Sequence, residues 1–328
     1  MKKTILTGLQ ATSEQLHIGN YFGAIKPLID QMKNPDLQFW LMVADLHSIT
    51  KALSIKDNHP YALWTLNLIK LYIACWVDLE RTVVFKQSDV PAHTQLERIL
   101  ACYTHLGFMQ RMHAYKDAEN KRELNLMSIG SMNYPILMAS DILLYNSDIV
   151  PVWKDQQQHV EYCVDIAQKF NHRYGEIFQI PQWQISEEVG EVPGIDGRKM
   201  SKSYNNFLGM LDTPEILRKK VNKIMTTDLL PQDPKDPDTC NVYQIIKLFL
   251  TDSEKSELRS TYQAGGMSYK YVKDYLYEKL ISFLGPIQEK YAQIDDSYVH
   301  ELLAKNAVIA NEAANQKIKQ VYQAIGFR

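Results

Sequence analysis

Short apolar runs alternate with longer stretches of helical periodicity through the first half of the chain. The predicted strands are residues 4–8, 39–44, 82–85 and 148–152. The helices predicted between and after them cover about 18–29, 60–77, 91–112 and 155–175. Residues 39–44 form a continuous apolar run, which is typical of a strand buried on both faces. This alternation predicts an α/β fold in which helices cover a parallel sheet.

The pattern changes near residue 187. Residues 187–194 form a boundary by composition, and beyond Ser203 helical patterns dominate. Residues 228–239 are a Pro/Asp-rich loop between helices, and from residue 280 we expect helices interrupted near Pro286. The chain therefore divides into an α/β part and a helical part.

Ligands of such sheets bind beyond the carboxyl ends of the strands. We therefore expect four segments that follow the predicted strands to face one crevice: 8–10, 45–47, 87–89 and 153–155.

The segment His17-Ile18-Gly19-Asn20 lies after the first strand, where a helix begins. A helix N-terminus presents unpaired N–H groups and a positive dipole end, which suit a phosphate. Gly19 would let a nucleotide approach the backbone. In isolation, such residues are more often simple helix caps.

A second segment, Gly197-Arg198-Lys199-Met200-Ser201-Lys202-Ser203, holds two lysines three residues apart. They could clamp polyphosphate oxygens, and Gly194 and Gly197 could act as hinges for loop closure. The alternative is a solvated basic turn. The five residues from Lys199 to Ser203 spell a signature too specific for that alternative.

Together the two segments resemble the signatures of class I aminoacyl-tRNA synthetases. The flanking segments resemble those of tryptophanyl-tRNA synthetases of the bacterial type, over essentially the whole chain. These flanks are residues 7–10, 19–24, 45–50, 87–93, 138–145 and 148–152.

The resemblance implies a Rossmann-like, nucleotide-binding catalytic domain over residues 1–192, with a helical dimerisation insertion at about 90–135. Residues 193–328 would hold the mobile lysine loop and a helical domain that binds the tRNA anticodon, with a last helix able to pack back on the catalytic domain. The implied partners are L-tryptophan, ATP, tRNA(Trp) and a second copy of the chain, with residues 103–112 in the dimer region.

The amino-acid pocket can also be argued from spacing. Tyr134, Met138 and Asp141 lie at i, i+4 and i+7, on one face of a helix that we expect Pro135 to open. Asp141 could accept the indole N–H of tryptophan, which can only donate. The alternative is a structural aspartate that caps a helix or pairs with an arginine. The sister tyrosyl enzymes typically carry Gln where this chain has Met138, and a polarizable thioether suits an aromatic face.

The remaining site residues are implied by the resemblance alone. Gln10, Tyr134 and Gln156 would orient the ammonium and carboxylate groups, and Val150, Val152 and His47 would surround the ring. The implied ATP-binding residues are Gln10, Ala11, Thr12, Gly19, Asn20, Trp153, Lys154, Asp155, Val192, Lys199, Met200, Ser201, Lys202 and Ser203. Ala11, Leu46 and the pair Trp153-Lys154 depart from the family pattern, which weakens the roles of those side chains. Asp155 would accept from a ribose hydroxyl.

The implied reaction has two steps, adenylate formation and acyl transfer to tRNA. The first depends on positioning and charge neutralisation. We predict that His17, Asn20, Lys199 and Lys202 supply these as the catalytic residues. No resident metal site is predicted, and Mg²⁺ would arrive with the ATP phosphates.

Composition bounds this hypothesis. The 328 residues carry 36 basic and 38 acidic side chains, a net charge of −2, and 45% are hydrophobic, which excludes a disordered chain. Residues 196–225 nevertheless hold seven basic against three acidic residues, so a nucleic-acid partner remains open. The longest apolar run has seven residues, so no membrane span is expected. The start has no apolar signal region, and four scattered cysteines predict buried thiols in the cytoplasm.

Three alternatives remain at this stage: a tyrosyl synthetase, a simple nucleotidyltransferase, and a synthetase paralogue retained for RNA binding or regulation. ATP–pyrophosphate exchange measured with each amino acid separates them.

Overall fold

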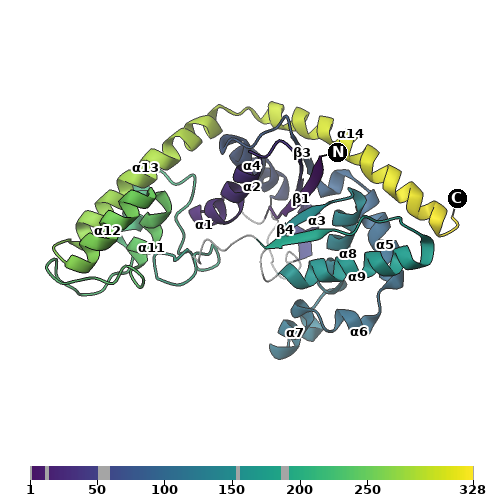
Figure 1. Ribbon diagram of the computed structural model, residues 1–328, viewed down its shortest axis with the longest axis horizontal. Helices are drawn as coiled ribbons and strands as arrows, with labels where there is room; N and C mark the ends of the chain where they lie inside the picture. Colours follow the sequence, from purple (N-terminus) through teal and green to yellow (C-terminus); the bar gives the residue numbers. More distant parts are fainter. Residues whose placement is uncertain (1, 12–14, 51–59, 153–155, 186–191, 328) are drawn as a thin grey trace.

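The computed structural model of the protein describes residues 2–11, 15–50, 60–152, 156–185 and 192–327. Five parallel strands form one sheet in the order β3-β2-β1-β4-β5, as Figure 1 shows. Their bounds are β1 Lys3–Leu9, β2 Leu37–Val43, β3 Thr82–Lys86, β4 Ile149–Val152 and β5 Gln182–Ile185. The predicted α/β class is therefore confirmed. The sequence prediction missed β5, because this edge strand of four residues lacks an apolar run.

Helices make up most of the rest. Before the third strand and around the insertion they are α1 Ile18–Asn20, η1 Tyr21–Ile25, α2 Lys26–Gln31, α3 Asp45–Ser48, α4 Tyr61–Ala74, η3 Gln87–Asp89, α5 Ala92–Tyr103, α6 Leu106–Met109, α7 His113–Asn120, η4 Leu124–Leu126 and α8 Ile129–Leu144. The later ones are α9 Gln157–Tyr174, α10 Pro214–Asn222, α11 Asn241–Ile246, η6 Lys247–Phe249, α12 Asp252–Ala264, α13 Tyr269–Gln293 and α14 Asp296–Ala324.

Three predicted helix boundaries are wrong. The helix expected at 91–112 is divided into α5 and α6, because Thr104 takes an extended conformation. Pro135 does not open α8; Ser128 caps that helix, its Oγ accepting from the N–H of Ser131 at 3.0 Å. Pro286 does not interrupt α13. The chain breaks later, at Ile294, and Asp295 caps α14. A proline removes one hydrogen bond, which packing along a long helix can offset.

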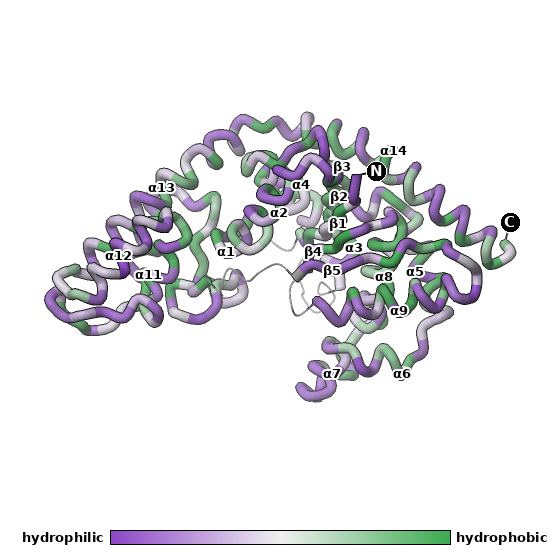
Figure 2. The backbone as a smooth tube through the Cα atoms, in the orientation of Figure 1, coloured by the Kyte–Doolittle hydropathy of each residue, from purple (hydrophilic) through white to green (hydrophobic). Residues whose placement is uncertain are grey.

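The sheet is buried on both faces, as predicted for residues 39–44. Phe39 and Leu41 face one hydrophobic core, whereas Trp40 and Met42 face the other. Side chains alternate across a strand, so a continuous apolar run supplies both cores. Figure 2 shows these hydrophobic strands at the centre of the α/β part.

The two last helices form a long arch over the molecule (Figure 1). Leu276 of α13 belongs to the same core as Phe39, so the C-terminal helices continue the first core. Helix α14 packs on the second core through Ala310 and Ala314, and Asn306 Nδ2 donates to the carbonyl oxygen of Val84 at 3.0 Å. The arch thereby connects the helical part to the edge strand β3.

Two further expectations can be compared with the structure. Cys75 and Cys163 are buried thiols, as predicted, but Cys102, in α5, is exposed and Cys240, the residue before α11, is half-buried. Within the described ranges, no helix combines the length and apolar character that crossing a membrane requires.

Candidate active site

His17 and Asn20 close the N-terminus of α1 as a capping box. Asn20 N donates to His17 Nδ1 at 3.3 Å, and His17 N donates to Asn20 Oδ1 at 3.1 Å. The Nδ1 atom of His17 is therefore an acceptor, which leaves its hydrogen on Nε2. A Cβ atom at position 19 would lie 3.0 Å from His17 Nδ1, so any larger residue here would crowd the histidine ring.

The segment that contains both lysines folds as a small hairpin. Met200 N donates to Val192 O at 2.8 Å and Gly194 N donates to Arg198 O at 2.7 Å, while Gly197 takes a φ of 81° at the turn. Asn206 holds the hairpin from inside: its Oδ1 accepts from Ser201 N at 2.7 Å. A Cβ atom at position 194 would collide with Asn206, so the second glycine is required for packing.

The structure brings the first signature segment against residues 208 and 209, which follow the lysine segment, although the two are far apart in the sequence. Ile18 N donates to Leu208 O at 3.0 Å, and His17 pairs with Gly209 in an isolated bridge. Burial, and secondarily the charge of Lys202, lowers the pKa of His17 to about 4. Burial lowers the pKa of Lys202 to about 8. At neutral pH the pair is therefore a neutral imidazole donor beside an ammonium group.

A cavity of about 680 Å³ lies beyond the carboxyl ends of β1, β2 and β4. All eight residues expected around tryptophan line it: Gln10, His47, Tyr134, Met138, Asp141, Val150, Val152 and Gln156. Asn20 of the first signature segment also lines the cavity. The predicted crevice is therefore confirmed for two of its four segments, 8–10 and 45–47, whereas no residue of 87–89 lines the cavity and 153–155 lie outside the described residues. The lining mixes apolar and polar side chains that converge on one space, as in small-molecule sites.

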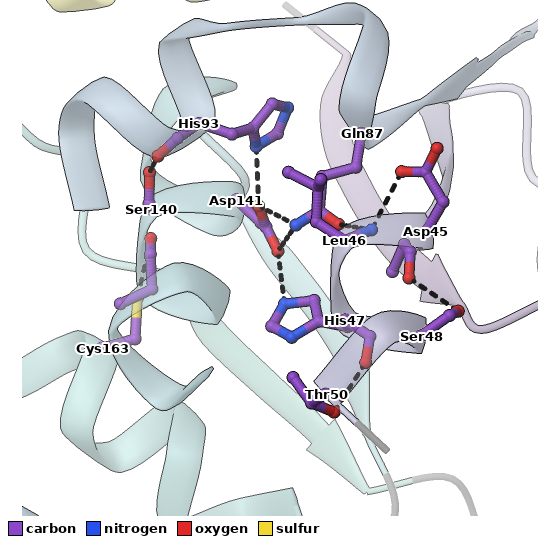
Figure 3. Close-up of polar contacts among 12 residues, drawn as sticks. Asp45, Leu46, His47, Ser48, Thr50, Gln87, His93, Ser140, Asp141 and Cys163 are labelled. Carbon is purple, nitrogen blue, oxygen red and sulfur yellow. Dashed lines mark hydrogen bonds and ion pairs between the residues drawn. The ribbon is translucent and has the colours of Figure 1, made fainter. Parts of the chain in front are cut away.

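Asp141 is the buried carboxylate of this cavity, with only 2% of its surface exposed. Figure 3 shows its partners approaching from three directions. His47 Nε2 lies 3.0 Å from Oδ2, His93 Nδ1 lies 2.6 Å from Oδ1, and Gln87 Nε2 lies 2.9 Å from both oxygens. The structural alternative of a helix cap or an arginine pair is therefore wrong.

Burial alone would raise the pKa of the Asp141 carboxyl, but the hydrogen bonds from His47 and His93 outweigh it and lower this pKa to about 2. Asp141 is consequently an anion that can only accept hydrogen bonds.

Several residues that support the cavity were given no role from the sequence, although the segment 87–89 was expected at the crevice. Gln87 and His93 hold Asp141, and His159 Nε2 lies 2.6 Å from the hydroxyl of Tyr134. The sequence offered one sign of these roles: the residues are polar, and they either follow β3 or lie among apolar residues of a helix. Their contacts with α8 depend on packing that no local pattern encodes.

Some predicted ATP-binding residues have their side chains directed elsewhere. Met200, Val192 and Ala11 are buried in the hydrophobic core. Their contribution to a nucleotide would come from backbone groups, and Val192 O already accepts from Met200 N. Thr12, Trp153, Lys154 and Asp155 lie outside the described residues. Across the described ranges no cluster of three His, Cys, Asp or Glu residues could hold a metal ion.

Comparisons with known proteins agree on one group. Residues 2–285 match the family described as tRNA synthetases class I (W and Y). The chain is 39% identical to the tryptophan–tRNA ligase of Campylobacter jejuni strain RM1221, covering 98% of this chain and 99% of the relative. It is also 39% identical to the tryptophan–tRNA ligase of Neisseria meningitidis serogroup A, covering 100% of this chain and 98% of the relative.

A solved structure is similarly related. The tryptophanyl-tRNA synthetase from Campylobacter jejuni in complex with ADP and tryptophan has a TM-score of 0.87 and 39% sequence identity, covering 98% of this chain and 99% of that chain.

Proposed function

The chain belongs to the class I tRNA synthetases of the tryptophan and tyrosine type, and from this premise we propose that it is a tryptophan–tRNA ligase. It activates L-tryptophan with ATP to tryptophanyl-adenylate and pyrophosphate, and then transfers the tryptophanyl group to the 3′ end of tRNA(Trp). The observation that carries this proposal is the cavity that contains Asp141 and is lined by Asn20 of the first signature segment.

The choice of tryptophan over tyrosine depends on the chemistry of the cavity. Asp141 is an anionic acceptor, and an indole N–H is a donor without acceptor capacity. Met138, Val150 and Val152 offer an apolar surface for a bicyclic ring. The sister ligand, a phenol, can also accept a hydrogen bond, and the glutamine typical of that enzyme, which could donate one, is replaced here by Met138.

The nucleotide would lie between α1 and the lysine hairpin. The carboxylate of tryptophan attacks the α-phosphorus in line, the bond to the β-phosphate oxygen breaks, and pyrophosphate leaves. Such a step needs positioning and stabilisation of charge on the phosphates. His17 Nε2–H and the amide of Asn20 would donate from one side, and the ammonium groups of Lys199 and Lys202 from the other. Mg²⁺ would enter bound to the ATP phosphates, as part of that substrate.

The tRNA would contact the helical part of the chain, where α10 carries Arg218, Lys219 and Lys220. A homodimer would form through the insertion, since Leu106, Leu126 and Ile129 expose more than 60% of their side chains there. Cytoplasmic placement follows from the need for tRNA and ATP.

The decisive experiment is ATP–pyrophosphate exchange measured separately with each of the twenty amino acids. Exchange with tryptophan alone supports the proposal, and aminoacylation of tRNA(Trp) then tests the second step. Exchange with tyrosine would overturn the assignment in favour of the sister enzyme. No exchange with any amino acid would favour a paralogue without catalysis.

A further inference from the structure

His93 is a buried histidine that no step of the proposed reaction uses. It lies in α5 with none of its surface exposed, and it does not line the cavity. Nδ1 lies 2.6 Å from Asp141 Oδ1, and Nε2 lies 2.8 Å from the hydroxyl of Tyr145. Its backbone carbonyl accepts from Ser140 Oγ at 2.6 Å, which ties this turn of α5 to α8.

The direction of the hydrogen bond to Asp141 is determined by the acceptor. An ionised carboxylate has no hydrogen to give, so Nδ1 of His93 must carry one, whichever state the rest of the ring has. Tyr145 then holds the other end of the ring, and Phe85 stacks on its face at 6.2 Å between centroids. The imidazole is therefore held by two hydrogen bonds and a ring contact.

His93 and His47 approach the carboxylate from opposite sides (Figure 3). His47 lines the cavity and contacts Oδ2, whereas His93 contacts Oδ1 from behind. Gln87 Nε2 also donates to both oxygens, and hydrogen bonds weaken steeply when their angle is poor. The donor behind Oδ1 has the shortest of these contacts, and together with Gln87 it orients the cavity side of the carboxylate.

We propose that His93 is the positioning residue that orients Asp141 toward the N–H group of the substrate ring and thereby sets the preference for an N–H-bearing side chain. This inference rests on the proposed function, in which Asp141 accepts the indole N–H. His93 itself touches no substrate.

The test compares two amino acids in ATP–pyrophosphate exchange: tryptophan, and β-(benzothiophen-3-yl)alanine, in which sulfur replaces the ring N–H. In His93→Leu, kcat/KM for tryptophan should fall about 10- to 100-fold, the effect of losing a buried hydrogen bond to a charged group. The value for the sulfur analogue should change less than about threefold, and KM for ATP should stay constant.

Two matched variants separate positioning from structural support. In His93→Asn the amide nitrogen can take the place of Nδ1 and should restore most of the discrimination. In His93→Gln the nitrogen would reach toward Tyr145 instead and should not. Because both substrates are measured on the same variant, a loss of folded protein lowers both values and leaves their ratio unchanged.

The outcomes distinguish the two levels of the argument. If the unaltered enzyme does not discriminate between tryptophan and the sulfur analogue, the role proposed for Asp141 fails. If it does discriminate but His93→Leu lowers both values equally, or Asn and Gln behave alike, the role proposed for His93 is overturned while the ligase assignment stands.

Discussion

Burial and charge oppose each other at Lys202. Its ammonium group loses hydration, and this desolvation lowers its pKa to about 8. Neighbouring His17 is kept neutral by burial and by the same lysine. The arrangement provides one positive charge and one neutral donor that a phosphate can engage with little further reorganisation.

Replacing Lys202 by alanine should lower adenylate formation on the order of 10²–10³-fold, since one preorganised charge donor is lost. Tryptophan binding should change little, because Asp141 and the apolar walls remain. Pyrophosphate exchange gives the rate, and equilibrium binding of tryptophan is the control. Unchanged exchange would contradict the role of Lys202.

The pH dependence follows from the same lysine. Below pH 8 Lys202 is charged, and above it the charge is lost progressively, so kcat/KM for ATP should fall by up to tenfold for each unit above about pH 8. Arginine stays protonated throughout, so Lys202→Arg should lack this alkaline decline even if its activity is lower. If the unaltered protein and Lys202→Arg show the same decline above pH 8, the titrating group is not Lys202.

At the level of elements, α14 protects the edge of the sheet. β3 pairs with β2 on one side, so part of its backbone on the other side needs partners. Asn306 donates to Val84 O, and Asn311 Nδ2 donates to Asp89 O at 2.8 Å. The C-terminal helix thus contributes to the stability of the domain that holds the active site.

Asn306→Ala should destabilise the fold by about 1–3 kcal/mol, because it leaves the carbonyl of Val84 without this buried donor. Exposed Asn315, on the same helix, is the matched control, and its alanine variant should stay within about 0.5 kcal/mol. Denaturant unfolding measures the free energy of unfolding of each variant. Equal values for the two variants would contradict the role of Asn306 in protecting the edge of the sheet.

For the whole molecule, the apolar surface of the insertion predicts self-association. Leu106 is 61% exposed in α6, within the region expected at a dimer interface. Light scattering should give the mass of a dimer, and Leu106→Glu should shift it toward the monomer. Leu63→Glu changes a 48% exposed leucine in α4 and should leave the mass unchanged. A monomeric unaltered protein would refute the prediction.

The sequence alone determined the features that depend on local order. Short β-rich runs located four of the five strands, and β2 was the clearest because burial on both faces favours a nearly continuous apolar run. The spacing of Tyr134, Met138 and Asp141 placed them on one helix face, since helical geometry is set locally. His17 and Lys202 were found because they belong to short signature motifs. The reaction was inferred from the family that these motifs resemble.

Only the tertiary structure decided which distant residues meet. His93 and Gln87 reach Asp141 because α5 and η3 pack against α8, and no periodicity reports such a contact. The uninterrupted α13 and the position of α14 on β3 likewise result from packing, which outweighed the local preference of Pro286. The local sequence pattern shows which side of a helix or strand is buried. Which element packs on that side depends on the free energy of the whole fold.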